Sequence, residues 1–90
     1  MTVLEDNPAD GRFEWREGGH IAFVDYRRAD GRLIIDHVEA PSELRGTGAA
    51  GRLMQAVADF AHGEGVKITP LCSYARAWLQ RDPANTVLLG

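Results

Sequence analysis

The chain has 90 residues, with 13 acidic and 10 basic side chains and a formal net charge of -3 at pH 7. This length is at or below the usual size of one domain, which excludes a two-domain enzyme. The acidic balance argues against a nucleic-acid partner, because such binding normally needs an excess of Lys and Arg on one face.

The first half of the chain predicts three antiparallel strands. Residues 1–11 are polar and rich in turn formers, so we expect a flexible N-terminal arm, followed by a single domain over residues 12–90. Apolar and charged residues alternate over 13–16, and an apolar run resumes over 21–26 beyond a Gly-Gly pair, which predicts a hairpin. An Asp-Gly turn then leads into a third strand over 33–38.

The second half changes period. Apolar residues recur at three- and four-residue steps over 50–61, which predicts an amphipathic helix that Gly63 and Gly65 would end. A short strand over 66–69 should lie parallel to the third strand, because strand–helix–strand units cross over with right-handed topology. A helix over 72–81 and an apolar tail, either an edge strand or a flap, follow. The order β-β-β-α-β-α indicates an α+β fold on one mixed, mostly antiparallel sheet.

The sequence also indicates where the protein works. Cys72 is the single cysteine, so no internal disulfide can form and a reducing compartment is expected. The first residues lack the basic and apolar pattern of a secretory signal. No stretch approaches the roughly 18 uninterrupted apolar residues of a membrane-spanning helix. We therefore expect a cytoplasmic protein without a membrane partner.

A glycine-rich segment lies where a polar loop becomes the first helix. Backbone N–H groups at a helix start are unpaired donors at the positive end of the helix dipole. Glycines let an anion approach this backbone, and an arginine at each end of the segment could add charge-assisted hydrogen bonds. A pyrophosphate-binding site is therefore predicted from Arg45, Gly46, Thr47, Gly48, Ala49, Ala50, Gly51 and Arg52. The alternative is that the glycines serve only a tight turn and close helix packing.

Other phosphate-binding motifs fit less well. The glycines match the Gly-x-Gly-x-x-Gly pattern of dinucleotide-binding folds, but the preceding strand is predicted to end near residue 38, too far from Gly46. The strand over 66–69 carries no acidic residue to hold a ribose, and 90 residues cannot build a doubly wound sheet. A Walker loop is excluded, because the sequence contains neither Gly-Lys-Ser nor Gly-Lys-Thr.

The segment resembles a known family. Its Arg-x-x-Gly-x-Ala pattern is similar to the coenzyme A pyrophosphate loop of GCN5-related N-acetyltransferases. Together, the segments 35–39, 44–50 and 70–74 resemble the small, cysteine-bearing branch of that superfamily. The resemblance implies a minimal acyl-coenzyme A N-acyltransferase fold that binds acetyl-coenzyme A, with the pantetheine arm against the strand ending at His37 and Val38 and the thioester near Cys72.

Three residues are candidates for catalysis. Cys72 begins a predicted helix, whose dipole favours a thiolate; it could carry the acetyl group, only line the site, or be a small buried hydrophobe. His37 is predicted on the same strand face as Leu33 and Ile35, as a general base or as a hydrogen-bonded histidine near a strand end. The resemblance implies that Tyr74 could protonate the departing thiolate, unless it packs beneath the ligand.

The leading hypothesis is an acetyl-coenzyme A-dependent N-acetyltransferase acting on an amine of a small molecule or protein. A second is a module or partner subunit that binds coenzyme A or acyl-coenzyme A without turnover, and a third is an interaction domain. No metal is expected, because the His and Cys residues lack paired-ligand spacing. The sequence leaves the acceptor and the oligomeric state open.

Overall fold

The strands of the sheet lie side by side in chain order. The computed structural model describes residues 3–90, in which the five strands are β1 (Glu5–Asn7), β2 (Arg12–Glu17), β3 (His20–Ala29), β4 (Arg32–Glu39) and β5 (Lys67–Pro70). Strands β1 to β4 pair antiparallel, whereas β5 pairs parallel to β4. The prediction of a mixed, mostly antiparallel sheet with the last strand beside the third is confirmed.

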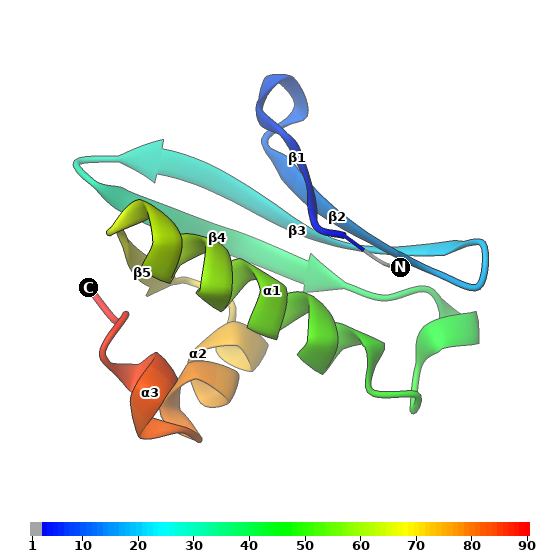
Figure 1. Cartoon of the computed structure of the whole chain (residues 1–90). Helices are drawn as coiled ribbons and strands as arrows, with labels where there is room; N and C mark the ends of the chain where they lie inside the picture. The colour runs from blue at the N-terminus through cyan, green and yellow to red at the C-terminus, as the bar shows by residue number, and fades with distance from the viewer. Residues whose placement is uncertain (1–2) are drawn as a thin grey trace.

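The helices follow β4 and β5. They are α1 (Ala49–Glu64), α2 (Ser73–Gln80) and the short α3 (Pro83–Thr86), and one-turn 3-10 helices cover Pro8–Asp10 and Ser42–Leu44. Figure 1 shows α1 and α2 on the same side of the sheet, and no α-helix of residues 3–90 covers the opposite face. None of the helices within residues 3–90 combines the length and the apolar character needed to cross a bilayer.

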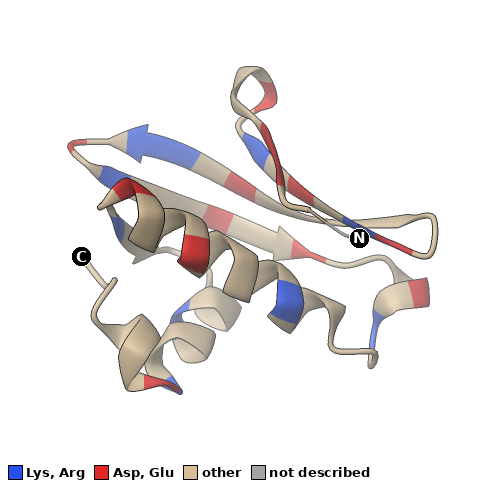
Figure 2. Cartoon of the chain, viewed as in Figure 1, with Lys and Arg blue, Asp and Glu red and all other residues tan. Residues whose placement is uncertain are grey.

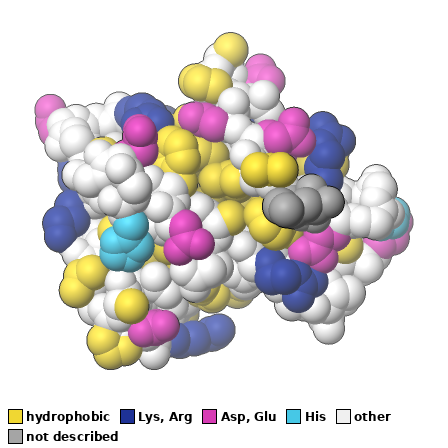
Figure 3. Space-filling model, in the orientation of Figure 1, with side chains coloured by type: hydrophobic (Ala, Val, Ile, Leu, Met, Phe, Trp, Pro, Cys, Tyr) yellow, Lys and Arg dark blue, Asp and Glu magenta, His cyan; other side chains and the backbone are white. Residues whose placement is uncertain are grey.

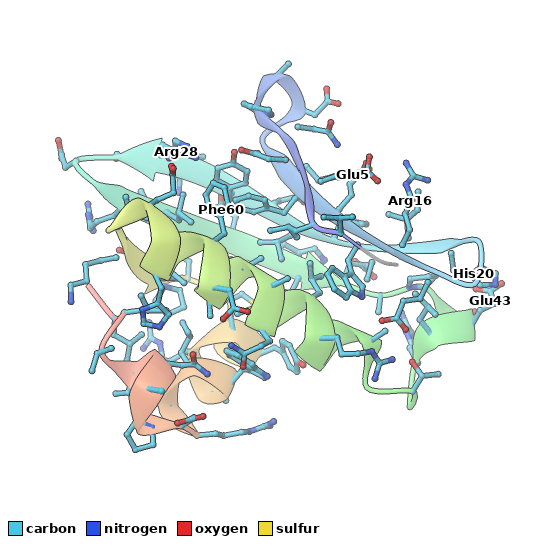
Figure 4. The ribbon with its side chains drawn as sticks, viewed as in Figure 1. Glu5, Arg16, His20, Arg28, Glu43 and Phe60 are labelled. Atoms are coloured by element: carbon cyan, nitrogen blue, oxygen red, sulfur yellow. The ribbon has the colours of Figure 1, made fainter. Side chains whose placement is uncertain are left out.

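The core lies between α1 and the sheet. Phe13 stacks on Tyr26 with ring centroids 4.2 Å apart and meets the edge of Phe60 at 5.1 Å. The Arg28 guanidinium covers the outer side of the Phe60 ring at 5.6 Å, as Figure 4 shows. The fully buried residues of α1 are Ala49, Leu53, Met54, Val57, Ala58 and Ala61. Each buried side chain of leucine size contributes roughly 1.5 to 3 kcal/mol, so this packing fixes the start of α1 relative to the sheet.

Two boundaries differ from the predictions. Residues 1–11 were expected to be an arm outside the fold, but Glu5–Asn7 pair with β2, and the Tyr26 hydroxyl donates to Asp6 at 2.5 Å. The polar composition that suggested an arm is that of an edge strand. Met1 and Thr2 lie outside the described residues.

The C-terminal tail, expected to be an edge strand or a flap, does not form a full strand. Leu89 makes only a single parallel bridge to Ile68. The α3 turn had not been predicted, although Asp82 caps it by accepting a hydrogen bond from the Ala84 amide.

A β-bulge interrupts the alternation of side chains along β4. Tyr26 is paired with Ile35, but the next residue back, Asp25, is paired with His37, so Asp36 is one extra residue in β4. An extra residue shifts the following side chains to the opposite face and bends the strand. Val38 therefore packs against the core, whereas His37 lies on the sheet face away from α1. The prediction that His37 shares the face of Leu33 and Ile35 is wrong for this reason.

Charges are mixed across the surface. On the face without helices, Arg12 pairs with Asp25 at 2.9 Å and Arg27 with Asp36 at 2.9 Å. The opposite face, seen in Figure 3, also carries both signs, interspersed with hydrophobic side chains, and neither sign forms a continuous patch there. Exposed pairs of this kind typically contribute about 0 to 1 kcal/mol each, so they tune the surface more than they hold the fold.

Candidate active site

The loop that leads from β4 to α1 is anchored at both ends of its 3-10 turn. Leu44 is buried in the core, and the turn lies against the end of the β2–β3 hairpin. Figure 4 shows Glu43 of this turn beside His20 of β3. The pKa of Glu43 is lowered, first by a hydrogen bond from its own backbone N–H and then by the charge of His20. These contacts fix where α1 begins.

The first turn of α1 presents free backbone donors. The Arg52 amide donates to Gly48 O at 3.1 Å as the first helical hydrogen bond, and the Ala49 amide uses Thr47 Oγ1 at 3.3 Å. The amides of Gly48, Ala50 and Gly51 donate to no acceptor within residues 3–90. Unpaired N–H groups at the positive end of a 16-residue helix are suited to an anion.

Two glycines in this loop adopt a backbone that other residues rarely take. Gly46 has φ 78° and Gly48, the N-cap of α1, has φ 85°. A Cβ at Gly46 would meet no atom within 4 Å, so the reason for glycine there is the backbone angle. A Cβ at Gly48 would lie 3.0 Å from Nη1 of Arg52, so this glycine also leaves room for the arginine.

The two arginines of the loop are held differently. Arg52 makes a two-point ion pair with Glu17 of β2, with both N–O distances 2.7 Å. This pair, followed by the Trp15 indole N–H, lowers the pKa of Glu17 to about 2. Arg45 has an exposed side chain that reaches Ala40 O at 3.2 Å and Glu39 only at 3.8 Å. In Figure 2 the ribbon is coloured for Lys or Arg in the loop and again in the first turns of α1.

Beside this loop, β4 and β5 separate. They are paired over Arg32–Ile35 and Lys67–Pro70, and the Leu71 amide makes a further hydrogen bond to Ile35 O at 2.9 Å. Residues 36–39 of β4 have β3 on one side, but no strand of residues 3–90 on the other. The backbone groups along this part of β4 are therefore open to an extended ligand.

Cys72 and Tyr74 lie where the two strands separate. Cys72 is the N-cap of α2, and its half-buried side chain packs against the edge of the core. Tyr74, in the first turn of α2, is exposed, and its hydroxyl has no hydrogen-bond partner within residues 3–90. Trp78 of α2 lies next to the start of α1, with Nε1 3.6 Å from the position of a Cβ on Gly51. The structure thus brings Cys72, Tyr74 and the loop to one side of the sheet.

His37 does not join that group. Its ring lies on the face without helices, 6.5 Å from the Phe23 ring, and half of its side chain is exposed. Its Nε2 lies 2.5 Å from Oε2 of Glu39. This contact holds the pKa of Glu39 below its ordinary value, with a smaller contribution from the charge of Arg45.

Sequence reasoning missed two residues of this region. Glu39 could have been found, because residues two apart on a strand share a face and the His-x-Glu spacing places it beside His37. Glu17 gave no local signal, since it is 35 residues before its partner Arg52.

Comparisons with known proteins agree with this architecture. A family model for the GCN5-related N-acetyl-transferases matches residues 12–88. The NMR solution structure of a GCN5-like protein from Staphylococcus aureus superposes with a TM-score of 0.73 and 26% sequence identity, over 97% of this chain and 86% of that chain. The chain therefore belongs to the GCN5-related N-acetyltransferase family.

Proposed function

We propose that the protein is an N-acetyltransferase that takes an acetyl group from acetyl-coenzyme A and transfers it to an amine. One observation carries this proposal: the free amides at the start of α1 lie beside the unpaired part of β4. Coenzyme A has a diphosphate that suits the first feature and an extended arm with two amide groups that suits the second.

The loop fits the diphosphate in charge and in shape. The amides of Gly48, Ala50 and Gly51 have no acceptor within residues 3–90, and the glycines at 46 and 48 keep side chains away from them. Arg45 is the cation that could turn toward the anion, because its present contacts are long and its side chain is exposed. Thr47 and Ala49 belong to the same turn, where Thr47 Oγ1 accepts a hydrogen bond from the Ala49 amide. For Arg52, binding to phosphate would compete with its pair to Glu17.

The pantetheine arm fits the edge of β4 near Val38. Amide groups in an extended ligand can bond to strand backbone as an added strand would. The arm would then run from the start of α1 toward Leu71, where β5 joins β4, and end near Cys72. When bound, acetyl-coenzyme A supplies the activated thioester.

The chain's own residues then have distinct roles. Cys72 lies where the arm would end and either receives the acetyl group or lines the site. His37 serves as the base that accepts the proton of the amine, which requires the acceptor to approach from the face without helices. Tyr74, with its free hydroxyl at the start of α2, is placed to donate a proton to the departing sulfur.

Calorimetry and a thiol assay test the function. Calorimetry with acetyl-coenzyme A should show binding; no binding would leave only an interaction domain. Release of free thiol with a panel of amines and proteins should show turnover; binding without turnover would favour a module or partner subunit that holds acyl-coenzyme A.

The role of Cys72 has its own test. If Cys72 carries the acetyl group, mass spectrometry after mixing with acetyl-coenzyme A should find an added acetyl group, and Cys72→Ala should lose both the adduct and turnover. Unchanged turnover in Cys72→Ala without any adduct would limit Cys72 to lining the site. Cys72→Ser is the matched variant, because it nearly keeps the size of the side chain but replaces the nucleophilic thiol with a hydroxyl.

A further inference from the structure

We propose that Glu39 is a positioning residue that fixes the proton of neutral His37 on Nε2, so that Nδ1 is the basic nitrogen. The proposal rests on the function proposed above, since it names the atom that would accept the proton of the amine. It also makes a claim about the free protein that can be measured without turnover.

The geometry begins with the bulge in β4. Because Asp36 is an extra residue, the alternation restarts at His37, and Glu39 lies two residues further on the same face. The two side chains meet there, with His37 Nε2 2.5 Å from Glu39 Oε2. Glu39 Oε1 is turned toward Arg45, whose Nη2 is 3.8 Å away. Glu39 therefore connects the candidate base to the loop at the start of α1.

The other charged groups near His37 are already engaged. Asp25 is directly opposite His37 in the register with β3, but it accepts a hydrogen bond from Arg12 Nε at 2.9 Å. The Arg12 guanidinium also lies 3.8 Å from the centre of the Phe23 ring. The Phe23 ring in turn is next to His37, with the two ring centroids 6.5 Å apart. Asp36, the neighbour of His37 along β4, makes two hydrogen bonds with Arg27. Within residues 3–90, Glu39 is the carboxylate that contacts the imidazole.

The tautomer follows from the chemistry of this contact. An ionised carboxylate can only accept hydrogen bonds, so at 2.5 Å the imidazole nitrogen facing it must carry the proton. Both the hydrogen bond from His37 and the charge of Arg45 favour the ionised form of Glu39. With Nε2 protonated, neutral His37 has its lone pair on Nδ1, which has no hydrogen-bond partner within residues 3–90.

Transfer of the acetyl group moves one proton from the amine to His37. The amine nitrogen forms a bond to the acetyl carbon as the carbon–sulfur bond breaks and the electron pair leaves with sulfur. The proton lost by the amine goes to Nδ1, and His37 becomes an imidazolium that faces the carboxylate of Glu39 through Nε2. The proton leaves to solvent afterwards, because the imidazole side chain is 53% exposed.

NMR of the free protein tests the tautomer. In protein labelled with 15N at histidine, at a pH where His37 is neutral, Nε2 should give the shift of a protonated ring nitrogen and Nδ1 that of an unprotonated one. In Glu39→Gln, whose amide can both donate and accept, the two shifts should move toward each other. In Asp25→Asn, the matched control on the same face, they should stay as in the natural protein. A proton on Nδ1 in the natural protein, or identical shifts in Glu39→Gln, would overturn the proposal.

Kinetics test the consequence for catalysis. General bases typically contribute 10²- to 10⁴-fold, so a variant that only misplaces the proton, Glu39→Gln, should lose about tenfold in kcat. Its KM for acetyl-coenzyme A should remain within about twofold of the natural value, because the loop amides are untouched and the contact that Arg45 loses is a long one of 3.8 Å. Full kcat in Glu39→Gln would overturn the positioning role. A natural protein with the expected tautomer but no turnover on any amine would instead count against the proposed function.

Discussion

The two arginines at the ends of the glycine-rich loop look equivalent in the sequence but are in different situations in the structure. Arg52 is bound by Glu17 through two hydrogen bonds of 2.7 Å, whereas the nearest ion-pair distance of Arg45 is 3.8 Å. On one side of the helix start, Arg52 is thus bound to Glu17 of β2. On the other side, Arg45 is a cation with only weak contacts. We infer that Arg45 serves the ligand and that Arg52 chiefly holds α1 against the sheet.

The difference shows that residues at similar distances from a motif can have different partners. A charged side chain that already has a two-point partner must give up that partner to bind a ligand. A charged side chain with only long contacts loses little interaction energy when it turns toward a ligand. The comparison can therefore be tested by changing each side of the helix start separately and measuring both affinity and stability.

The largest effect is expected on the Arg45 side. Arg45→Glu should weaken binding of acetyl-coenzyme A by on the order of 100-fold, because a repulsive charge replaces an attractive one beside the diphosphate. The unfolding midpoint should change little, since Arg45 is exposed and outside the core. Isothermal titration calorimetry and thermal unfolding give the two readouts.

Arg81→Glu is the matched control, because it makes the same charge change on an exposed residue just beyond α2. This variant should bind acetyl-coenzyme A with an affinity close to that of the natural protein. An Arg45→Glu protein that binds as tightly as the natural one would remove Arg45 from the site.

A smaller effect is expected from Gly48→Val at the N-cap of α1. With φ 85°, a β-branched residue is strained there by about 2 kcal/mol, and its Cβ would displace the Arg52 guanidinium. Both stability and affinity should fall, with affinity falling by about tenfold because the side chain limits approach to the amides. Denaturant unfolding and calorimetry measure the two losses.

Gly63→Val is the control for this change. Gly63 is near the other end of α1, and a Cβ there would meet no atom within 4 Å. It should leave the affinity for acetyl-coenzyme A unchanged. Equal losses of affinity in the two variants would mean that only the stability of α1, and not access to its first turn, affects binding.

The sequence predicted this region unevenly. The periodicity of 50–61 and the loop glycines placed the start of α1 within a residue, because helix patterns and glycine signals are local. The face of His37 was missed, because one extra residue in β4 reverses every side chain after it and leaves no local trace. The Arg52–Glu17 pair depends on the packing of α1 on β2, so it could be seen only once the fold was known.

The Arg52 side should make a small contribution to stability, with a pH dependence that is set by Glu17. The hydrogen bonds from Arg52 and then from Trp15 lower the pKa of Glu17 to about 2 in the folded protein, from an ordinary value of 4.5. As the pH falls, the carboxylate of Glu17 is therefore protonated in the unfolded chain before it is protonated in the folded one. A lowered carboxyl pKa stabilises the protein fully above the ordinary value, and the gain disappears as pH falls toward about 2. The natural protein should therefore be more stable than Glu17→Gln at pH 7, and the gap should close in acid.

Urea unfolding of both proteins between pH 7 and pH 2 measures this gap, and the subtraction removes the titration of the other carboxyl groups. Glu17→Gln should bind acetyl-coenzyme A at least as well as the natural protein, because Arg52 is released. A constant gap at every pH would show that the ion pair contributes nothing to the pH dependence.

The smallest effect, and the one that decides between the two explanations for the glycines, is expected from Gly51→Ala. Gly51 is in the first turn of α1, and an added Cβ would lie 3.6 Å from Nε1 of Trp78, an ordinary contact distance. Replacing a helical glycine by alanine typically adds about 0.5 to 1 kcal/mol of stability, so the variant should unfold at a higher urea concentration. If the third glycine serves the approach of phosphate to its amide, the same variant should bind acetyl-coenzyme A a few-fold more weakly. A less stable protein with unchanged affinity would mean instead that Gly51 is there to let α1 and α2 pack closely.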